Sequence, residues 1–477
     1  MSLYIKNATI ITMDPKYGTV HGGLIIENGT IHAIVDAAQN QELDRSNIDE
    51  EYDADGYVII PGLINSHYHS YANLLKGFGN DLPLEIWSIF TVAYGQSLDE
   101  EGSALAVTLG TMEMMKNGIT CCLDHFPHLL RTESALMAYQ QSGMRVIFAP
   151  MLQDIPDYRL LPVSLPIEEY IRLEKTKPKS PSDMLTYYED LIQRWHGKDA
   201  KIQIAVGPNA PQRCSEGMLQ IGKQLSQTNH LHLHTHLLET KIQANLGGAV
   251  HLLEKIGMLD SPISLAHSVW LKPEEMNLIE GKPVTIVHNP ASNMILGSGK
   301  APILEYLKRG ISVALGTDAS NCGTEHNLFE TMRLALMLQR SGETDYRKWL
   351  HHEDVFRMAT IGGAKAVGME RKIGILSPGA CADLVLLKKD SISLTPLNNL
   401  LKQIVYYGNG RDVESVMING QWTIKNGKFV TLNEKQIIQK AKMYREKMKK
   451  GASQAVQQAR QQQPYFERMY REFFNLE

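Results

Sequence analysis

The chain has 477 residues, of which 43% are hydrophobic and 21% charged, as is ordinary for a soluble globular protein. The formal net charge of −4 gives no reason to expect nucleic acid or a membrane surface as a partner. The five cysteines form no CxxC motif, which argues against a disulfide framework and a thiolate zinc site. The opening residues lack a signal-peptide pattern and no apolar run is long enough to span a bilayer, so we expect a cytoplasmic protein.

Short β-strands are predicted at both ends of the chain. The β-rich stretches are residues 4–13, 23–35, 379–390 and 413–430. Three Asn-Gly pairs mark expected hairpin turns within them: Asn28-Gly29, Asn419-Gly420 and Asn426-Gly427. We expect the two ends to pair into one small β-sandwich domain, built from residues 1–59 and 370–432.

Between these ends, short apolar runs alternate with longer helical stretches. The eight runs are residues 58–69, 118–126, 145–151, 201–209, 230–236, 263–269, 283–290 and 312–320. Helices fit the gaps, for example at 102–118 and 132–143, each of which ends at a glycine suited to a C-cap. Eight such repeats predict an α/β fold with a (β/α)8 TIM barrel over residues 60–369.

The last segment, residues 433–477, is rich in helix formers and predicts a C-terminal helical extension punctuated by Gly451 and Pro464. Five apolar residues fall on one helical face: Phe466, Met469, Tyr470, Phe473 and Phe474. This face is expected to pack on the barrel or on a partner subunit, and the sequence leaves both open.

Polar residues follow the predicted strands, at the end where (β/α)8 enzymes carry their active sites. His67 and His69 lie two apart in one strand, so both side chains can face the barrel axis. Later strand ends add His236, Glu239, His267 and Asp318. Three imidazoles with a carboxylate suit a catalytic zinc or ferrous ion, and the acidic residues and His267 are candidates for proton transfer.

The stretch HLHLHTH, residues 230–236, places four histidines at alternate positions, so they share one face of a strand. Because they lie at different depths, they cannot all hold one ion. We expect His236, at the mouth of the barrel, to be the ligand and His234 to support the site from one layer deeper. His232 and His230 are expected to fill the barrel or its lower rim.

The motifs PGLINSHYH, HTHLLET, LAHSVWL, HNPASNMILGSG and GTDAS occur in the order found in the amidohydrolase superfamily, which the chain resembles over nearly its whole length. It resembles in particular the branch of deaminases and s-triazine hydrolases that act on nitrogen heterocycles. The resemblance implies a barrel, a β-sandwich re-entered at IGILSPGACADLVLL, and one divalent metal, zinc in most members with Fe²⁺ as an alternative. Binuclear relatives use a lysine after strand four, which VGPNAPQ lacks, so a mononuclear site is expected.

By the same resemblance, the metal ligands are His67, His69, His236 and Asp318. Glu239 would protonate a ring nitrogen, and His267 would orient the attacking water or polarise the substrate. Asp318 would also take the proton of the water and pass it to the departing amine.

Four residues are candidates for the substrate pocket: Trp87, Gln96, Phe126 and His128. Similar deaminases of nucleosides place a glutamate where this chain has Gln96. A carboxylate accepts hydrogen bonds from ribose hydroxyls better than an amide does. The expected substrate is therefore a compact aminated ring, such as a triazine, pyrimidine, purine base or pterin.

The sequence thus predicts a hydrolytic deaminase in which a metal-bound hydroxide displaces the exocyclic amine of an aromatic nitrogen heterocycle. One alternative is a hydrolase that displaces chloride or an alkylamine from an s-triazine-like ring. Another, from a different class, is a non-catalytic amidohydrolase-like scaffold, which the complete set of candidate ligands and acid/base residues disfavours. A homo-oligomer that binds a small heterocycle, and neither nucleic acid nor a membrane, is expected.

Overall fold

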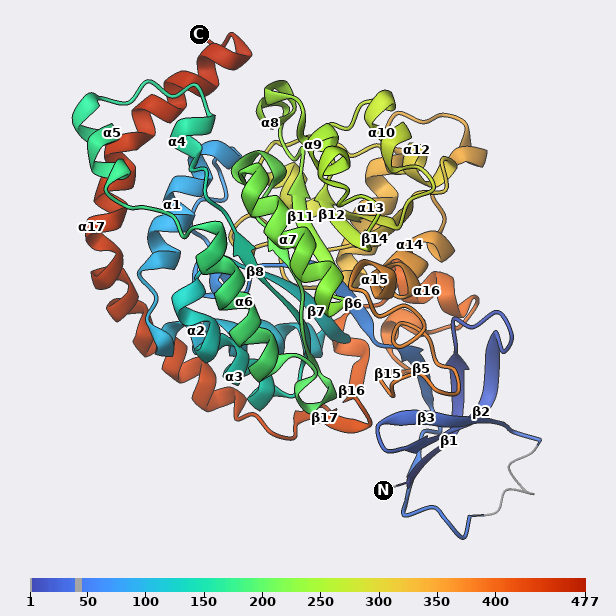
Figure 1. Cartoon of the computed structure of the whole chain (residues 1–477). Helices are drawn as coiled ribbons and strands as arrows, with labels where there is room; N and C mark the ends of the chain where they lie inside the picture. The colour runs from blue at the N-terminus through green and yellow to red at the C-terminus, as the bar shows by residue number, and fades with distance from the viewer. Residues whose placement is uncertain (1, 39–44) are drawn as a thin grey trace.

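A computed structural model describes residues 2–38 and 45–477, and parallel strands lie at its centre (Figure 1). The strands are β6 (Leu63–Tyr68), β7 (Ile119–Phe126), β8 (Arg145–Leu152), β9 (Ile202–Ile204), β10 (Gly207–Pro208), β11 (Leu233–Leu237), β12 (Ile263–His267), β13 (Val284–His288) and β14 (Ser312–Leu315). They form two parallel sheets, one from β6 to β10 and one from β11 to β14. Bridges between Val206 and Leu233 and between Tyr68 and Asp318 join the two sheets at both edges. β9 and β10 both pair with β8 and together occupy one place in the barrel. Counted in this way, the strands follow the predicted barrel order.

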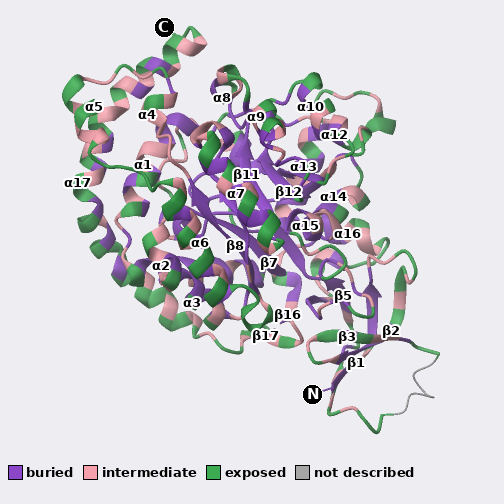
Figure 2. Cartoon of the chain, viewed as in Figure 1, coloured by how far each residue is buried: buried purple, intermediate pink, exposed green. Residues whose placement is uncertain are grey.

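Helices surround these strands on the outside (Figure 1). They are α1 (Leu84–Gln96), α2 (Glu100–Lys116), α3 (Thr132–Ser142), α4 (Asp157–Leu160), α5 (Ile167–Glu174), α6 (Pro181–Trp195), α7 (Glu216–Asn229), α8 (Lys241–Leu246), α9 (Ala249–Ile256), α10 (Pro273–Ile279), α11 (Pro290–Ile295), α12 (Ile303–Lys308), α13 (Leu328–Arg340), α14 (His352–Ala359), α15 (Ile361–Ala366) and α16 (Leu400–Tyr407). The barrel strands are almost wholly buried, whereas the helices expose their outer faces (Figure 2). The expected glycine stop is confirmed at α3, where Gly143 caps the helix with a φ of 76°.

A second, mixed sheet joins the two ends of the chain. Its strands are β1 (Ser2–Ile11), β2 (Thr19–Glu27), β3 (Thr30–Asp36), β4 (Glu50–Asp53), β5 (Tyr57–Pro61), β15 (Leu384–Lys388), β16 (Val413–Ile418), β17 (Gln421–Lys425) and β18 (Lys428–Phe429). The junction is the antiparallel pair of β5 and β15. All three Asn-Gly pairs have positive φ at both residues and connect paired strands, so the predicted hairpin turns are confirmed. The domain borders drawn from the sequence stay a prediction.

The chain passes from this sheet into the barrel at Gly62. A Cβ atom there would lie 1.9 Å from Oγ1 of Thr120, so the close approach of the two strands requires glycine. Nearby, the fully buried Arg145 donates hydrogen bonds of 2.6 and 2.9 Å to the two carboxylate oxygens of Asp383. This ion pair ties the first residue of β8 to the segment that enters β15.

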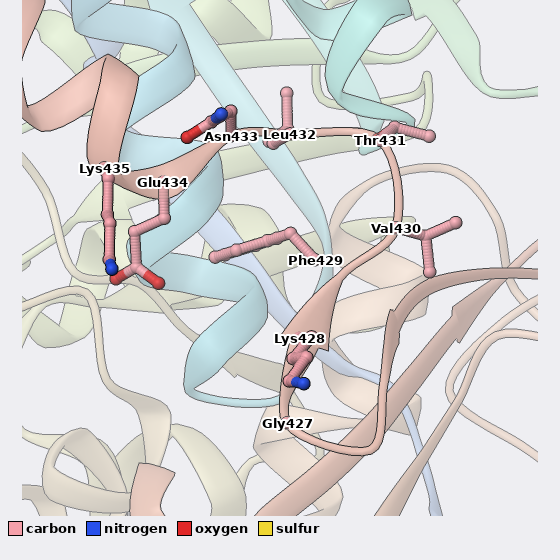
Figure 3. Close-up of a pocket in the computed structure, with 9 residues that line it drawn as sticks. All are labelled: Gly427, Lys428, Phe429, Val430, Thr431, Leu432, Asn433, Glu434 and Lys435. Carbon is pink, nitrogen blue, oxygen red and sulfur yellow. The ribbon is translucent and has the colours of Figure 1, made fainter.

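The C-terminal segment forms one helix, α17 (Glu434–Phe474), and Figure 3 shows its first two residues together with the segment from Gly427 to Asn433 that precedes it. Lys116 of α2 lies over the ring of Phe429, 5.7 Å from its centroid, and pairs with Glu434. The helix then runs along α1 and α2 on the outside of the barrel (Figure 1). Within the described ranges, no helix combines the length and the apolar character needed to cross a membrane.

The expected interruptions of this helix are wrong, because α17 continues through Gly451 and Pro464. Apolar residues on both sides of Pro464 are buried against α1, and this packing offsets the loss of one backbone donor. The sequence left open whether the aromatic face of this helix packs on the barrel or on a partner subunit. In the structure it packs on the barrel. Phe466 and Met469 are buried in a cluster that includes Ile86 of α1.

Candidate metal centre

Four of the predicted residues converge at the carboxyl end of the barrel. His67 lies near the end of β6 and His69 directly follows this strand, His236 lies near the end of β11, and Asp318 follows β14. The Nε2 atoms of His69 and His236 are 3.3 Å apart. Oδ1 of Asp318 lies 3.4 Å from Nε2 of His69 and 3.6 Å from Nε2 of His67. One atom from each side chain therefore faces a shared centre.

Hydrogen bonds orient two of these imidazoles. Nδ1 of His69 donates to the carbonyl oxygen of His125, and Nδ1 of His236 donates to that of Asn209, both at 2.6 Å. This arrangement leaves each Nε2 lone pair directed at the shared centre, as in metal-ligating histidines. Nε2 of His67 is buried and has no hydrogen-bond partner among the described residues.

The electrostatics of the three imidazoles also suit a metal. Burial lowers the pKa of His67, His69 and His236, so all three are neutral at physiological pH. Neutral imidazoles are the form that binds a cation. Three neutral nitrogens, one of them unpartnered, and the carboxylate of Asp318 thus fit a single divalent metal.

The histidines that precede His236 have distinct places. Nδ1 of His67 lies 2.8 Å from Nε2 of His234, whose own Nδ1 lies 2.7 Å from Oγ of Ser264. Nε2 of His232 also contacts that hydroxyl, at 3.0 Å. The exposed His230 caps α7 and lies outside β11, which begins at Leu233. His232 and His234 therefore form, through Ser264, a hydrogen-bonded chain that leads to His67, whereas the expectation that His230 shares this strand face is wrong.

Glu239 and His267 lie beside the same centre. Oε1 of Glu239 is buried without a hydrogen-bond partner in the described part of the chain, 3.8 Å from Nδ1 of His267. Burial raises the pKa of Glu239 to about 7, which poises it to hold or release a proton near neutrality. Nδ1 of His267 lies 2.9 Å from Oδ1 of Asn293, and its Nε2 lies 3.8 Å from Oδ2 of Asp318.

Several residues around the centre have strained backbone conformations. Leu238, His267, Ser268 and Asp318 all have positive φ values, of 45°, 69°, 48° and 60°. Non-glycine residues rarely adopt this conformation, and it persists where the surrounding structure enforces it, often at functional sites. These backbone conformations occur where β11, β12 and β14 end, at the mouth of the barrel.

Of the four predicted pocket residues, Phe126 and His128 lie side by side, with ring centroids 6.0 Å apart. Trp87 is buried, and its Nε1 donates to the carbonyl oxygen of Asn321, close to Asp318 in the chain. His128 packs edge-on against Tyr71, with ring centroids 4.6 Å apart. Phe126 is fully buried against Phe148, whereas Gln96 is exposed at the end of α1.

Two neighbours of the centre, His125 and Asn293, were not among the predicted site residues. The His125 ring lies 4.7 Å from that of His236, and His125 can share a metal-binding position with His67 and His236. His125 lies at the end of a predicted strand, and this position could have identified it as a neighbour of the centre. Asn293 holds His267 through its side chain, and no pattern in the sequence links these two positions, which are 26 residues apart.

Comparisons with known proteins show the family of the chain. The chain matches the amidohydrolase family over residues 58–423. A 5'-deoxyadenosine deaminase of Methanosarcina acetivorans is 31% identical over 455 residues, which cover 94% of this chain and 98% of the relative. A 5-methylthioadenosine/S-adenosylhomocysteine deaminase of Pyrococcus furiosus is 31% identical over 446 residues, covering 92% and 99%.

Solved structures share the fold at lower identity. The zinc complex of atrazine chlorohydrolase TrzN from Arthrobacter aurescens superimposes with a TM-score of 0.82 at 22% identity, covering 93% of this chain and 100% of that chain. A zinc-bound adenosine deaminase from Xanthomonas campestris gives a TM-score of 0.81 at 23% identity, covering 94% and 98%. These likenesses establish a common fold.

Proposed function

The chain belongs to the amidohydrolase family, and from this premise we propose that it is a metal-dependent hydrolytic deaminase of aminated nitrogen heterocycles. The observation that carries the proposal is the convergence of His67, His69, His236 and Asp318 beside the carboxylate of Glu239, whose Oε1 has no hydrogen-bond partner among the described residues. This combination offers both a cation site and a proton donor within one buried space.

His67, His69, His236 and Asp318 would hold one divalent metal, and zinc is the ion that we propose. Zinc favours nitrogen and oxygen donors in sites that leave one position open to water or substrate, and Fe²⁺ is the alternative. A metal in this position supplies Lewis acidity, which makes water nucleophilic at neutral pH.

The remaining chemistry is proton movement by side chains. Asp318 takes a proton from the attacking water through its Oδ2, on the side that faces His267. Glu239, protonated in part because of its raised pKa, donates to a ring nitrogen, so that electrons of the attacked C=N bond are accepted there. Asp318 then delivers its proton to the amine, which leaves as ammonia, while the second proton of the water passes to Glu239 and the ring carbon keeps the oxygen as a carbonyl. His267, held by Asn293, orients the water or the substrate.

For the substrate, we propose an adenosine-type nucleoside rather than the compact ring expected from Gln96. The support is the extent of similarity to deaminases named for 5'-deoxyadenosine and 5-methylthioadenosine, which spans more than nine-tenths of both chains. Gln96 is exposed at the end of α1, so its amide is a weak argument against a ribose. The 6-amino group of the purine would be the leaving group.

Ammonia release by the zinc-loaded protein tests this proposal. Adenosine analogues, free purines, pyrimidines, pterins and aminated triazines are compared at equal concentration, with a chlorinated triazine monitored for chloride. Deamination of an adenosine analogue supports the proposal. Chloride release without ammonia from any ring would favour the triazine hydrolase, and no turnover together with no bound metal would favour the scaffold.

A further inference from the structure

A pocket of about 230 Å³ opens at the carboxyl end of the barrel. Its lining includes Glu85 from α1, Thr240, Trp270 and Leu296 from three barrel loops, and Tyr470 and Phe474 from the end of α17. The last two residues lie almost 400 positions from Glu85 in the chain and reach this point because α17 runs the length of the barrel wall (Figure 1).

The pocket adjoins the acid/base side of the metal centre. Thr240 directly follows Glu239, Trp270 is the third residue after His267, and Leu296 is the third after Asn293. Each of the three barrel loops in its wall thus also carries a residue of the centre. The Glu85 carboxylate is near enough to contribute to the raised pKa of Glu239.

The lining is largely apolar and carries one carboxylate, Glu85, and one ammonium group, Lys241. The indole Nε1 of Trp270 donates to the carbonyl oxygen of Ser298 at 2.7 Å, so this nitrogen is already satisfied. Tyr470 and Phe474 pack with ring centroids 4.7 Å apart. Glu85, largely buried, accepts a hydrogen bond of 2.6 Å from Thr240 and is the acidic residue of this wall.

The end of α17 is held firmly enough to shape a binding pocket. Phe466 and Met469, on the same helix face, are buried in a cluster with Ile86, Leu161 and Ile242. Ile86 neighbours Glu85, and Ile242 itself lines the pocket. Packing of the helix and the shape of the pocket are therefore coupled.

We propose that this pocket is a specificity subsite, which receives the substituent that the substrate carries beyond its aminated ring. The substituent is apolar and bears a hydrogen-bond donor for Glu85. The inference rests on the proposed deaminase function. At about 230 Å³ the pocket is smaller than the ~300–1,000 Å³ typical of sites for whole ligands, which fits a part of the substrate whose ring lies at the metal centre.

The test uses the zinc-loaded full chain and adenosine derivatives with hydrogen, methylthio, amino or carboxylate at the 5' position. Phe474→Ala is compared with Phe473→Ala, a matched control, because Phe473 contacts the Phe474 ring but is not part of the pocket lining. We expect Phe474→Ala to lower kcat/KM about tenfold for the methylthio and amino derivatives and to leave the hydrogen derivative unchanged. Phe473→Ala should leave all four unchanged.

Glu85→Gln tests the acceptor while keeping the hydrogen bond from Thr240. The wild type should prefer the amino over the carboxylate derivative, and this ratio should fall about tenfold in the variant. If an alanine variant does not fold, Phe474→Leu and Tyr470→Phe are measured in its place. An equal loss for every derivative, or an unchanged amino-to-carboxylate ratio, would overturn the subsite. No deamination of any derivative by the wild type would instead refute the proposed function.

Discussion

Replacing His234 by leucine should weaken metal binding although His234 is not one of the four proposed ligands. Its Nε2 lies 2.8 Å from Nδ1 of His67, and both side chains are fully buried. Burial also lowers the pKa of His234 well below its usual value, so its ring is neutral and can accept a hydrogen bond from His67. Leucine has a similar volume but no acceptor, so the variant changes the hydrogen bond more than the packing.

The size of the effect follows from the loss of that one contact. Without a partner for Nδ1, the His67 ring is free to change tautomer or rotate, and metal binding must restrain it again. Loss of such a supporting hydrogen bond costs about 10- to 100-fold in metal affinity, or about 1.4–2.8 kcal/mol at ~1.4 kcal/mol per factor of ten. An unpartnered donor in a buried position costs a similar ~1–3 kcal/mol.

Competition with a chromophoric zinc chelator measures this affinity directly. His232→Leu is the control, because His232 contacts Ser264 at the next link of the chain and not His67. His234→Gln should recover most of the affinity, since its amide oxygen can replace the ring acceptor. An unchanged affinity in His234→Leu, or an equal loss in His232→Leu, would refute the idea that His234 orients His67.

Three further changes test the site and the fold. Asp318→Asn should lower kcat by about 10²–10⁴ with the melting temperature preserved, because an amide cannot take the proton of the water; wild-type turnover would contradict this role. Because burial raises the pKa of Glu239 to about 7 and the acid must carry its proton, kcat/KM should decline as the pH rises above about 7, and a flat profile would exclude it as the donor. Arg145→Met should destabilise the protein by about 3–5 kcal/mol in urea unfolding, because Asp383 is left charged and buried, and Asp383→Leu in the same chain should restore part of the loss.

Local pattern in the sequence predicted much of the fold and the centre of the site. Strand and helix alternation, the Asn-Gly turns and the glycine stop of α3 depend on neighbours along the chain, and these predictions agree with the structure. The spacing of His67 and His69 is equally local, because alternate residues of a strand face the same side. The family resemblance then connected them with His236 and Asp318, from distant strands, which the structure brings together.

Tertiary structure alone decided which groups surround that centre. The exposed position of Gln96, the contact of Asn293 with His267 and the approach of Tyr470 and Phe474 to Glu85 join segments with no shared local pattern. Likewise, α17 passes through Pro464 because its two halves pack on α1, although proline disfavours a helix locally. Propensity and periodicity act between near neighbours, whereas such contacts depend on how whole elements pack, and packing is a property of the folded chain.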